Sequence, residues 1–214
     1  MPHRERIEWC DIWVEDASGT SLPRVLLIGD SIARSYFPKV SDRLRGKCVC
    51  ARIASSKGVG DPQYLKELEL VIGEYQFSII HFNNGLHGWD YDESFYASGL
   101  AEAFDMFLAH CGAENVIWGS TTLVWKDVAS KTLGVRAERV RQRNKIAAAL
   151  AADRGIYVND LFATVADRPE LVSQDGVHFR EDGQSVLGEC VANAILNKTN
   201  AHTEQSPGPG SSGK

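Results

Sequence analysis

The sequence contains no stretch of about 18 apolar residues, the length that a membrane-spanning helix needs. Its beginning, Met1 to Glu8, is charged and lacks the apolar core of a signal peptide. From these two absences we expect a protein that neither enters a membrane nor is exported. We therefore expect it in the cytoplasm.

Cysteine is scarce, and positive charge is not concentrated in any one segment. The five cysteines are scattered, odd in number and without the spacing of a zinc site, so we expect free thiols and no bound metal. The formal net charge of -5 argues against a nucleic-acid partner, because phosphate binding requires clustered positive charge.

Strand and helix patterns alternate along most of the chain. Short apolar runs, each typical of a strand buried on both faces, occur at residues 24–29, 47–53, 77–82, 115–118 and 156–158. Helical patterns separate and follow them, one opening at Pro62 and others at residues 96–111, 135–154 and 181–196. Five repeats of strand and helix predict a five-stranded parallel sheet in a flavodoxin-like, three-layer α/β/α fold.

The length of 214 residues suits one domain, which we place at residues 22–196. Residues 1–21 form an N-terminal extension. Within it, residues 7–14 alternate imperfectly and fit either an added edge strand or a strap across the domain. Residues 197–214 are polar and rich in Gly, Ser and Pro, so we expect a disordered tail.

A serine stands where the first expected strand gives way to a helix, in the sequence Gly29-Asp30-Ser31. Serine often caps a helix at such a position. Ser31 is also well placed as a nucleophile, because active groups gather at the carboxyl ends of parallel strands and a helix N-terminus favours developing negative charge.

A base for this serine lies far along the chain, in a loop before the last helix. Asp175 and His178 are three residues apart, so their side chains can meet on one turn. The carboxylate would then hold the imidazole tautomer, with the other ring nitrogen free for Ser31. Taken alone, each residue is ordinary in a turn or at a helix start. The combination with Ser31 predicts a Ser-His-Asp triad.

The two motifs together resemble those of the GDSL-type, or SGNH, hydrolase superfamily, over about residues 22–196. Gly29-Asp30-Ser31 is similar to the first of its four blocks, and Asp175-x-x-His178 to the last. The resemblance implies that Ser31 is the nucleophile, His178 the general base and then acid, and Asp175 its orienting carboxylate. It also implies that the backbone N–H of Ser31 contributes to the oxyanion hole.

The middle blocks match less well. The second block supplies an oxyanion-hole glycine after the second strand, where Gly60, followed by an aspartate, fits better than Gly58. The third block normally reads Gly-x-Asn-Asp. In Gly85-Leu-His87 the histidine falls on the asparagine position, so either His87 or the nearby Asn84 is expected to be the third donor.

The segment after the fourth strand is expected to line a substrate pocket. Weaker candidates for substrate binding near this segment are Trp89, Thr122 and Trp125. The two tryptophans could form an apolar wall or a wall on which a sugar stacks. Arg143 and Asn144 fall on the following helix, where we expect a solvated face rather than a contact with substrate.

These residues predict a serine-dependent hydrolase of small acyl esters that needs no metal or cofactor. Such an enzyme forms an acyl-enzyme on Ser31 and releases it with water. By the habits of the superfamily that it resembles, an acetylated sugar is the first substrate to expect. Two alternatives stay open: an acyltransferase on the same scaffold, and a non-catalytic binding module with an altered oxyanion block. The sequence does not reveal the oligomeric state.

Overall fold

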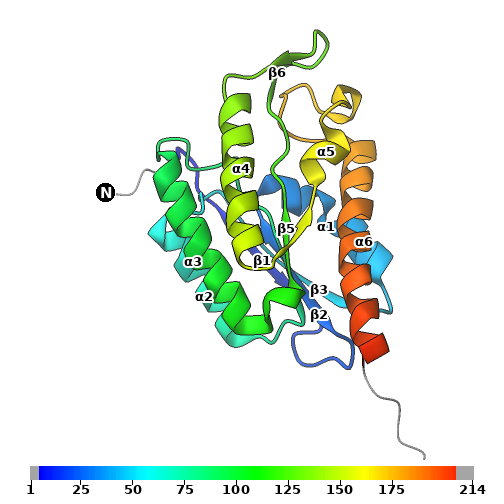
Figure 1. The fold of residues 1–214 in the computed structure, drawn as a ribbon. Coiled ribbons are helices and arrows are strands. Elements are labelled where there is room, and N and C mark those ends of the chain that lie inside the picture. Colours follow the sequence, from blue (N-terminus) through cyan, green and yellow to red (C-terminus); the bar gives the residue numbers. More distant parts are fainter. Residues whose placement is uncertain (1–4, 206–214) are drawn as a thin grey trace, which may run out of the picture.

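A six-stranded sheet forms the centre of the computed structural model, which describes the backbone of residues 5–205 and the side chains of residues 5–200 (Figure 1). Its order is β1-β3-β2-β4-β5-β8. The strands are β1 (Cys10–Val14), β2 (Arg24–Gly29), β3 (Val49–Ser55), β4 (Ile79–Phe82), β5 (Val116–Gly119) and β8 (Tyr157–Asn159). A separate hairpin pairs β6 (Trp125–Asp127) with β7 (Thr132–Leu133).

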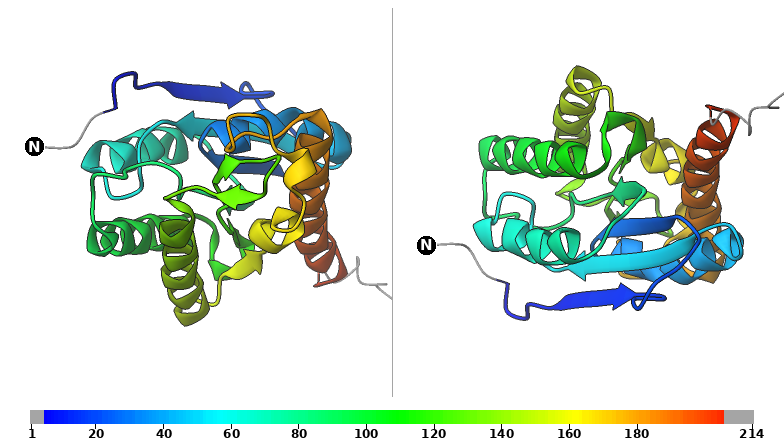
Figure 2. Two further views of the ribbon diagram at one scale, coloured as in Figure 1. Left: turned by 90° about the horizontal axis from the view of Figure 1, so that it is seen from above. Right: turned by 90° about the horizontal axis from the view of Figure 1, so that it is seen from below.

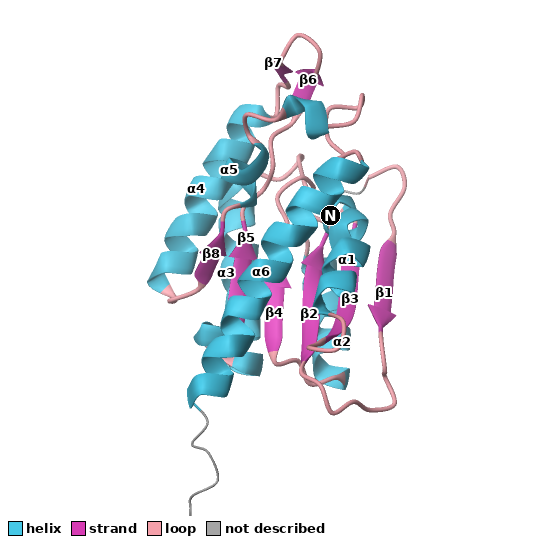
Figure 3. Cartoon of the chain, turned by 90° about the vertical axis from the view of Figure 1, so that its right-hand side faces the viewer, coloured by secondary structure: helices cyan, strands magenta, loops and turns pink. Residues whose placement is uncertain are grey.

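The five predicted parallel strands are all present, as β2, β3, β4, β5 and β8, so the predicted α/β fold is confirmed. The prediction of five strands was one short. Strand β1 runs antiparallel to β3 at the edge of the sheet, with Cys10 opposite Ser55 and Val14 opposite Ala51 (Figure 3). The N-terminal extension therefore contributes an edge strand. Its imperfect alternation has a physical reason, since an outer strand leaves side chains such as that of Trp13 exposed.

Helices cover both faces of the sheet (Figures 1 and 2). They are α1 (Ser31–Leu44), α2 (Pro62–Glu74), α3 (Glu93–Cys111), α4 (Ala137–Asp153), α5 (Leu161–Val165) and α6 (Glu181–Gln205), with short 3-10 turns at Ala113–Asn115 and Pro169–Leu171. One apolar core lies between the sheet and α1, α5 and α6. The other lies between the sheet and α2, α3 and α4. Every inner strand is thus buried on both faces, as the apolar runs predicted.

Helix boundaries coincide with capping and helix-breaking residues in the sequence. Pro62 occupies the first turn of α2, and the Asp61 carboxylate accepts a hydrogen bond from the Gln63 N–H. Gly112 ends α3 at a φ of 81°, a conformation that other residues adopt with strain. The last helix extends further than residue 196, to Gln205, because no glycine or proline interrupts the sequence before Pro207. Residues 206–214 of the predicted tail lie outside the described residues.

No helix within residues 5–205 is both long enough and apolar enough to cross a membrane.

Two helical glycines make a matched stability test. A Cβ at Gly99 of α3 would run into the Val59 carbonyl oxygen and lie 2.8 Å from the Gly60 Cα, whereas a Cβ at Gly73 of α2 would meet nothing within 4 Å. We expect Gly99→Ala to lower the free energy of unfolding by about 1–3 kcal/mol through overpacking. Gly73→Ala is expected to raise it by about 0.5–1 kcal/mol, because alanine is the better helix former. Urea denaturation followed by circular dichroism measures both, and stabilisation by Gly99→Ala would contradict the packing described here.

Candidate active site

The turn between β2 and α1 presents Ser31 at the carboxyl edge of the sheet. Asp30 caps α1, its Oδ1 accepting a hydrogen bond of 2.8 Å from the Ile32 N–H. Gly29 has no space for a side chain, because a Cβ there would lie 2.5 Å from the Ala33 Cβ and 2.8 Å from the Asn83 carbonyl oxygen. The strand thus meets the helix at close range, which leaves Ser31 on the rim rather than in the core.

The structure brings Ser31, His178 and Asp175 together in one hydrogen-bonded chain. The His178 Nε2 lies 2.9 Å from the Ser31 Oγ, and the His178 Nδ1 lies 2.7 Å from the Asp175 Oδ2. The other Asp175 oxygen accepts bonds of 2.9 Å from the backbone N–H groups of Val177 and His178. An aspartate held in this way fixes the ring through Nδ1–H and leaves Nε2 to accept the serine proton.

The charge on Asp175 is favoured by these same contacts. Partial burial acts to raise the pKa of Asp175, but the N–H groups of Val177 and His178 and the His178 ring outweigh it and lower the pKa below its ordinary value. The loop is also held from outside, since the Trp125 N–H donates to the Gly176 carbonyl at 2.8 Å. Gly176 has a φ of 75° and leaves no space for a Cβ against Trp125. Trp125 thus supports the loop that carries Asp175 and His178.

Asp30, next to Ser31, is a fully buried carboxyl. Burial raises its pKa above the ordinary value, while the charges of His87 and His178 act in the opposite direction. Its Oδ2 has no hydrogen-bond partner in the structure.

Asn84 and His87, the two candidates for the third oxyanion donor, differ in exposure. Asn84 is fully buried, and its Nδ2 donates to the Lys57 carbonyl at 2.9 Å. The His87 side chain is 15% exposed, and its Nδ1 lies 2.8 Å from the Glu5 Oε1. A substrate can therefore reach the ring more readily than the amide.

The two candidate glycines of the second block face different surroundings. Gly58 packs against Gly88, directly after His87, where a Cβ would lie 2.8 Å from the Gly88 Cα. Gly60 lies in a groove between α2 and α3, against the Phe95 carbonyl. The structure thus places Gly58, rather than Gly60, beside the His87 loop.

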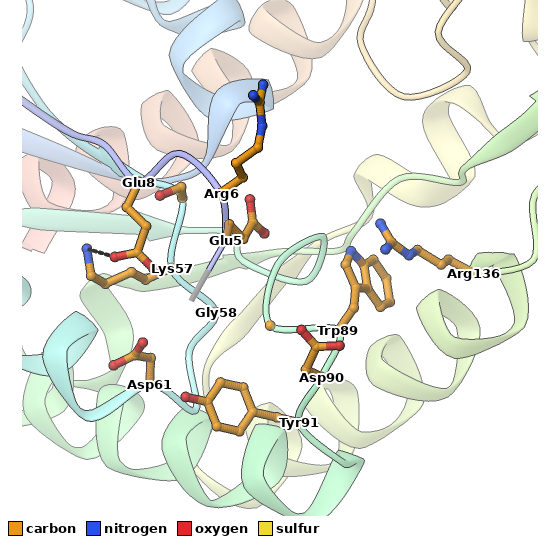
Figure 4. Close-up of a pocket in the computed structure, with 12 residues that line it drawn as sticks. Glu5, Arg6, Glu8, Lys57, Gly58, Asp61, Trp89, Asp90, Tyr91 and Arg136 are labelled. Atoms are coloured by element: carbon orange, nitrogen blue, oxygen red, sulfur yellow. Dashed lines mark ion pairs between the residues drawn. The ribbon is translucent and has the colours of Figure 1, made fainter. Parts of the chain in front are cut away.

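A polar cavity of about 290 Å³ lies beside these loops (Figure 4). Its walls come from the N-terminal segment, the loop after β3, the loop after β4 and the residue that precedes α4. They include Glu5, Arg6, Glu8, Ser56, Lys57, Gly58, Asp61, Gly88, Trp89, Asp90, Tyr91 and Arg136. Of the three residues predicted to contact substrate, Trp89 lines this cavity, whereas Thr122 and Trp125 are buried at 3% and 9% exposure.

Arg143 is buried, which corrects the prediction of a solvated helix face. Its guanidinium donates to the carbonyl oxygens of Gly85, His87 and Gly88 at 2.7–3.1 Å and to the Glu93 carboxylate at 2.8 Å. It also lies 4.4 Å from the centre of the Trp89 ring. Arg143 therefore fixes the backbone of the loop that carries His87.

Two neighbours of Arg143 on α4 hold the same region. Asn144 makes paired hydrogen bonds of 2.8 Å to the backbone N–H and carbonyl of Thr121, which also corrects the prediction for this residue. Arg139 donates to the carbonyl oxygens of Trp89 and Tyr91, both at 2.7 Å. The sequence of α4 did not predict that its arginines hold the loop after β4, because the carbonyl groups that they bind are distant in sequence.

The arrangement has the groups that nucleophilic acyl transfer needs. A hydroxyl, a base and an orienting carboxylate form one hydrogen-bonded chain, and groups able to donate hydrogen bonds lie beside it. Within the described part of the chain, no three His, Cys, Asp or Glu side chains are grouped to hold a metal ion.

Comparisons with known proteins give a likeness in structure alone. No protein-family profile and no curated protein match the sequence. The structure of a GDSL-like lipase from Bacteroides thetaiotaomicron is similar at a TM-score of 0.67 and 15% identity, covering 85% of this chain and 94% of that one. A lipase/acylhydrolase from Enterococcus faecalis gives 0.63 and 17%, covering 83% and 97%. An acetylxylan esterase from Geobacillus stearothermophilus gives 0.61 and 15%, covering 83% and 94%.

The buried carboxyl of Asp30 makes stability depend on pH. Because its folded-state pKa is raised, unfolding releases its proton, and stability falls as the pH rises above the ordinary value of 3.8. Asp30→Asn keeps an oxygen for the Ile32 N–H but does not titrate. We expect the free energy of unfolding of the variant, relative to wild type, to rise as the pH is raised above 3.8, because only the wild type loses this contribution. Urea denaturation across this range measures it, and a difference independent of pH would contradict the assignment.

Proposed function

The chain has the fold of the GDSL-like, or SGNH, hydrolases, and on this premise we propose that it is a serine-dependent hydrolase of small acyl esters. The observation that carries the proposal is the contact of 2.9 Å between the Ser31 Oγ and the His178 Nε2, with Asp175 on the far side of the ring. A serine that merely capped a helix would not need a histidine aligned on its hydroxyl.

In the proposed reaction, the Ser31 oxygen attacks the ester carbonyl while His178 takes the serine proton. Asp175 stabilises the imidazolium that forms. The tetrahedral intermediate collapses, the C–O bond to the alcohol breaks, and His178 returns the proton to the departing alcohol oxygen. Water then attacks the acyl-enzyme with the same proton transfers, which releases the acid and regenerates Ser31.

Donors for the oxyanion come from three places. The backbone N–H of Ser31 lies at the start of α1, where the helix dipole favours negative charge. A glycine N–H comes from the loop after β3. Gly58 is a second candidate for this donor, in addition to Gly60, the candidate from the sequence. As third donor we favour His87 over Asn84, because the His87 ring is partly exposed whereas the Asn84 amide is buried and already bound to Lys57.

An acetylated carbohydrate is the substrate class that we propose. The cavity beside the His87 loop is polar, with Trp89 and Tyr91 among carboxylates and arginines. Such a mixture suits a hydroxyl-rich alcohol better than an acyl chain, since an apolar chain would displace water from these charged groups without offering them hydrogen bonds. The esterase from Geobacillus stearothermophilus, similar in fold, is described as acting on acetylxylan.

Replacing the nucleophile tests the reaction. We expect Ser31→Ala to lower kcat on p-nitrophenyl acetate by about 10⁴-fold or more, because no other group can form the acyl-enzyme. Ser35→Ala is the matched control, since Ser35 lies one turn later on α1 and only donates to the Ile32 carbonyl. Full turnover by Ser31→Ala would rule out the triad.

Two further measurements address the alternatives, and a third addresses the substrate. A fluorophosphonate is expected to add to Ser31, detected as a mass shift on the peptide that carries it, and absence of labelling would favour a non-catalytic binding module. Product analysis with added sugar or alcohol acceptors is expected to give free acid, while acylated acceptor as the main product would identify an acyltransferase.

A panel of esters graded by acyl length, with acetylated sugars included, is expected to show the highest kcat/KM for acetyl groups on sugars.

A further inference from the structure

The residues before β1 lie across the edge of the candidate site. Glu5 and Glu8 come from this N-terminal segment, and their side chains enter the wall of the polar cavity shown in Figure 4. The opposite walls are the loops after β3 and β4. The segment is far in sequence from both loops, so its place there depends on its own contacts.

Three contacts fix the N-terminal segment to the domain. Trp9 makes two hydrogen bonds with Ser56: the Ser56 backbone N–H donates to the Trp9 carbonyl at 3.1 Å, and the Trp9 backbone N–H donates to the Ser56 hydroxyl oxygen at 3.0 Å. The Arg34 guanidinium, one turn after Ser31 on α1, lies 4.5 Å from the centre of the Trp9 ring. Glu8 pairs with Lys57 at 3.4 Å. The segment is thus held at the loop after β3 and at α1 before it reaches Glu5.

Glu5 is the contact closest to the chemistry. Its Oε1 lies 2.8 Å from the His87 Nδ1. A carboxylate only accepts hydrogen bonds, so the proton of this pair lies on Nδ1, and Nε2 is left free of Glu5. This repeats on a second histidine the relation between Asp175 and His178, in which a carboxylate on Nδ1 orients the ring for work at Nε2.

The backbone under His87 is fixed independently of Glu5. Arg143 holds the carbonyl oxygens of Gly85, His87 and Gly88, but none of these bonds involves the imidazole. Rotation of the ring about its side-chain bonds is therefore restrained on the Nδ1 side by Glu5. Two different elements thus fix His87: α4 holds its main chain, and the N-terminal segment holds its ring.

We propose that Glu5 is a positioning residue for His87: it holds the ring as an imidazolium whose Nε2–H donates to the oxyanion. With a carboxylate on Nδ1, Nε2 can donate only when both ring nitrogens carry a proton, and the negative charge of Glu5 compensates the positive ring. A charged donor forms a stronger hydrogen bond to an oxyanion than a neutral one does. The inference rests on the proposed function.

The test is a double-mutant cycle between Glu5 and His87 on p-nitrophenyl acetate. Glu5→Gln keeps the size and removes the charge, and we expect it to lower kcat about tenfold with less than a twofold change in KM. His87→Asn supplies an amide donor that needs no carboxylate, so adding Glu5→Gln to it is expected to change kcat less than twofold. Glu189→Gln, which breaks an exposed ion pair with Arg43, is the control and is expected to match wild type.

The outcomes separate this inference from the proposed function. Loss of activity in Ser31→Ala together with wild-type kcat in Glu5→Gln would overturn the inference and leave the function standing. An equal loss from Glu5→Gln in both backgrounds would also overturn it, because Glu5 would then act on the cavity rather than through His87. Full activity of Ser31→Ala would overturn the function, and the inference with it.

A spectroscopic measurement decides the case if His87→Asn has too little activity for the cycle. The ring nitrogens of His87 are assigned in long-range ¹H–¹⁵N spectra as the signals that are missing from His87→Asn. We expect both nitrogens to be protonated in wild type at neutral pH and one to lose its proton in Glu5→Gln. A neutral ring in wild type, or identical signals in the two proteins, would overturn the proposal.

Discussion

The hydrogen bond between Ser31 and His178 joins the first helix to the loop before the last one, and it depends on how closely α1 and α6 pack. Both helices lie on the same face of the sheet and share one apolar core. Gly188 of α6 permits the close approach, since a Cβ there would lie 2.6 Å from the Lys39 Cβ of α1. The distance between serine and histidine is therefore set by helix packing well below the site. A small shift between two helices would separate the hydroxyl from its base.

The same dependence on distant packing holds for the loop after β4. Arg143 is buried and surrounded by carbonyl oxygens, and the Glu93 carboxylate pairs with both Arg143 and Arg139. A buried guanidinium is stable only when its donors are all satisfied, so this loop and α4 specify each other's position. The loop then presents His87 on one side and Trp89 on the other. The positions of His87 and Trp89, two of the proposed site residues, thus both depend on the buried Arg143.

Much of the fold and the centre of the site could be predicted from the sequence because their signals are local. Apolar runs marked the inner strands, and Gly112 marked a helix end by its backbone freedom. Ser31, Asp175 and His178 stood out because the residues proposed as nucleophile, carboxylate and base occupy short motifs at element ends. The added strand β1 was ambiguous, since an edge strand exposed on its outer side does not show clean alternation.

The remaining site residues could not be predicted because their roles depend on contacts between distant segments. Arg143 acts on carbonyl groups more than 50 residues away, and carbonyls carry no sequence signal. The choice between Gly58 and Gly60 depends on which of them packs against Gly88. Similarly, nothing in the sequence around Glu5 indicates that it meets His87.

Exposure separates the two parts of the candidate site. The Asp175 and His178 side chains are 51% and 45% exposed, whereas the His87 side chain, in contact with Glu5, is only 15% exposed. In water, a hydrogen bond to an oxyanion competes with solvent, and in an enclosed site it does not. A base must exchange protons with incoming water, so an exposed His178 suits its proposed role. A donor to developing charge works best away from water, and Glu5 of the N-terminal segment covers the Nδ1 side of His87, the donor proposed above.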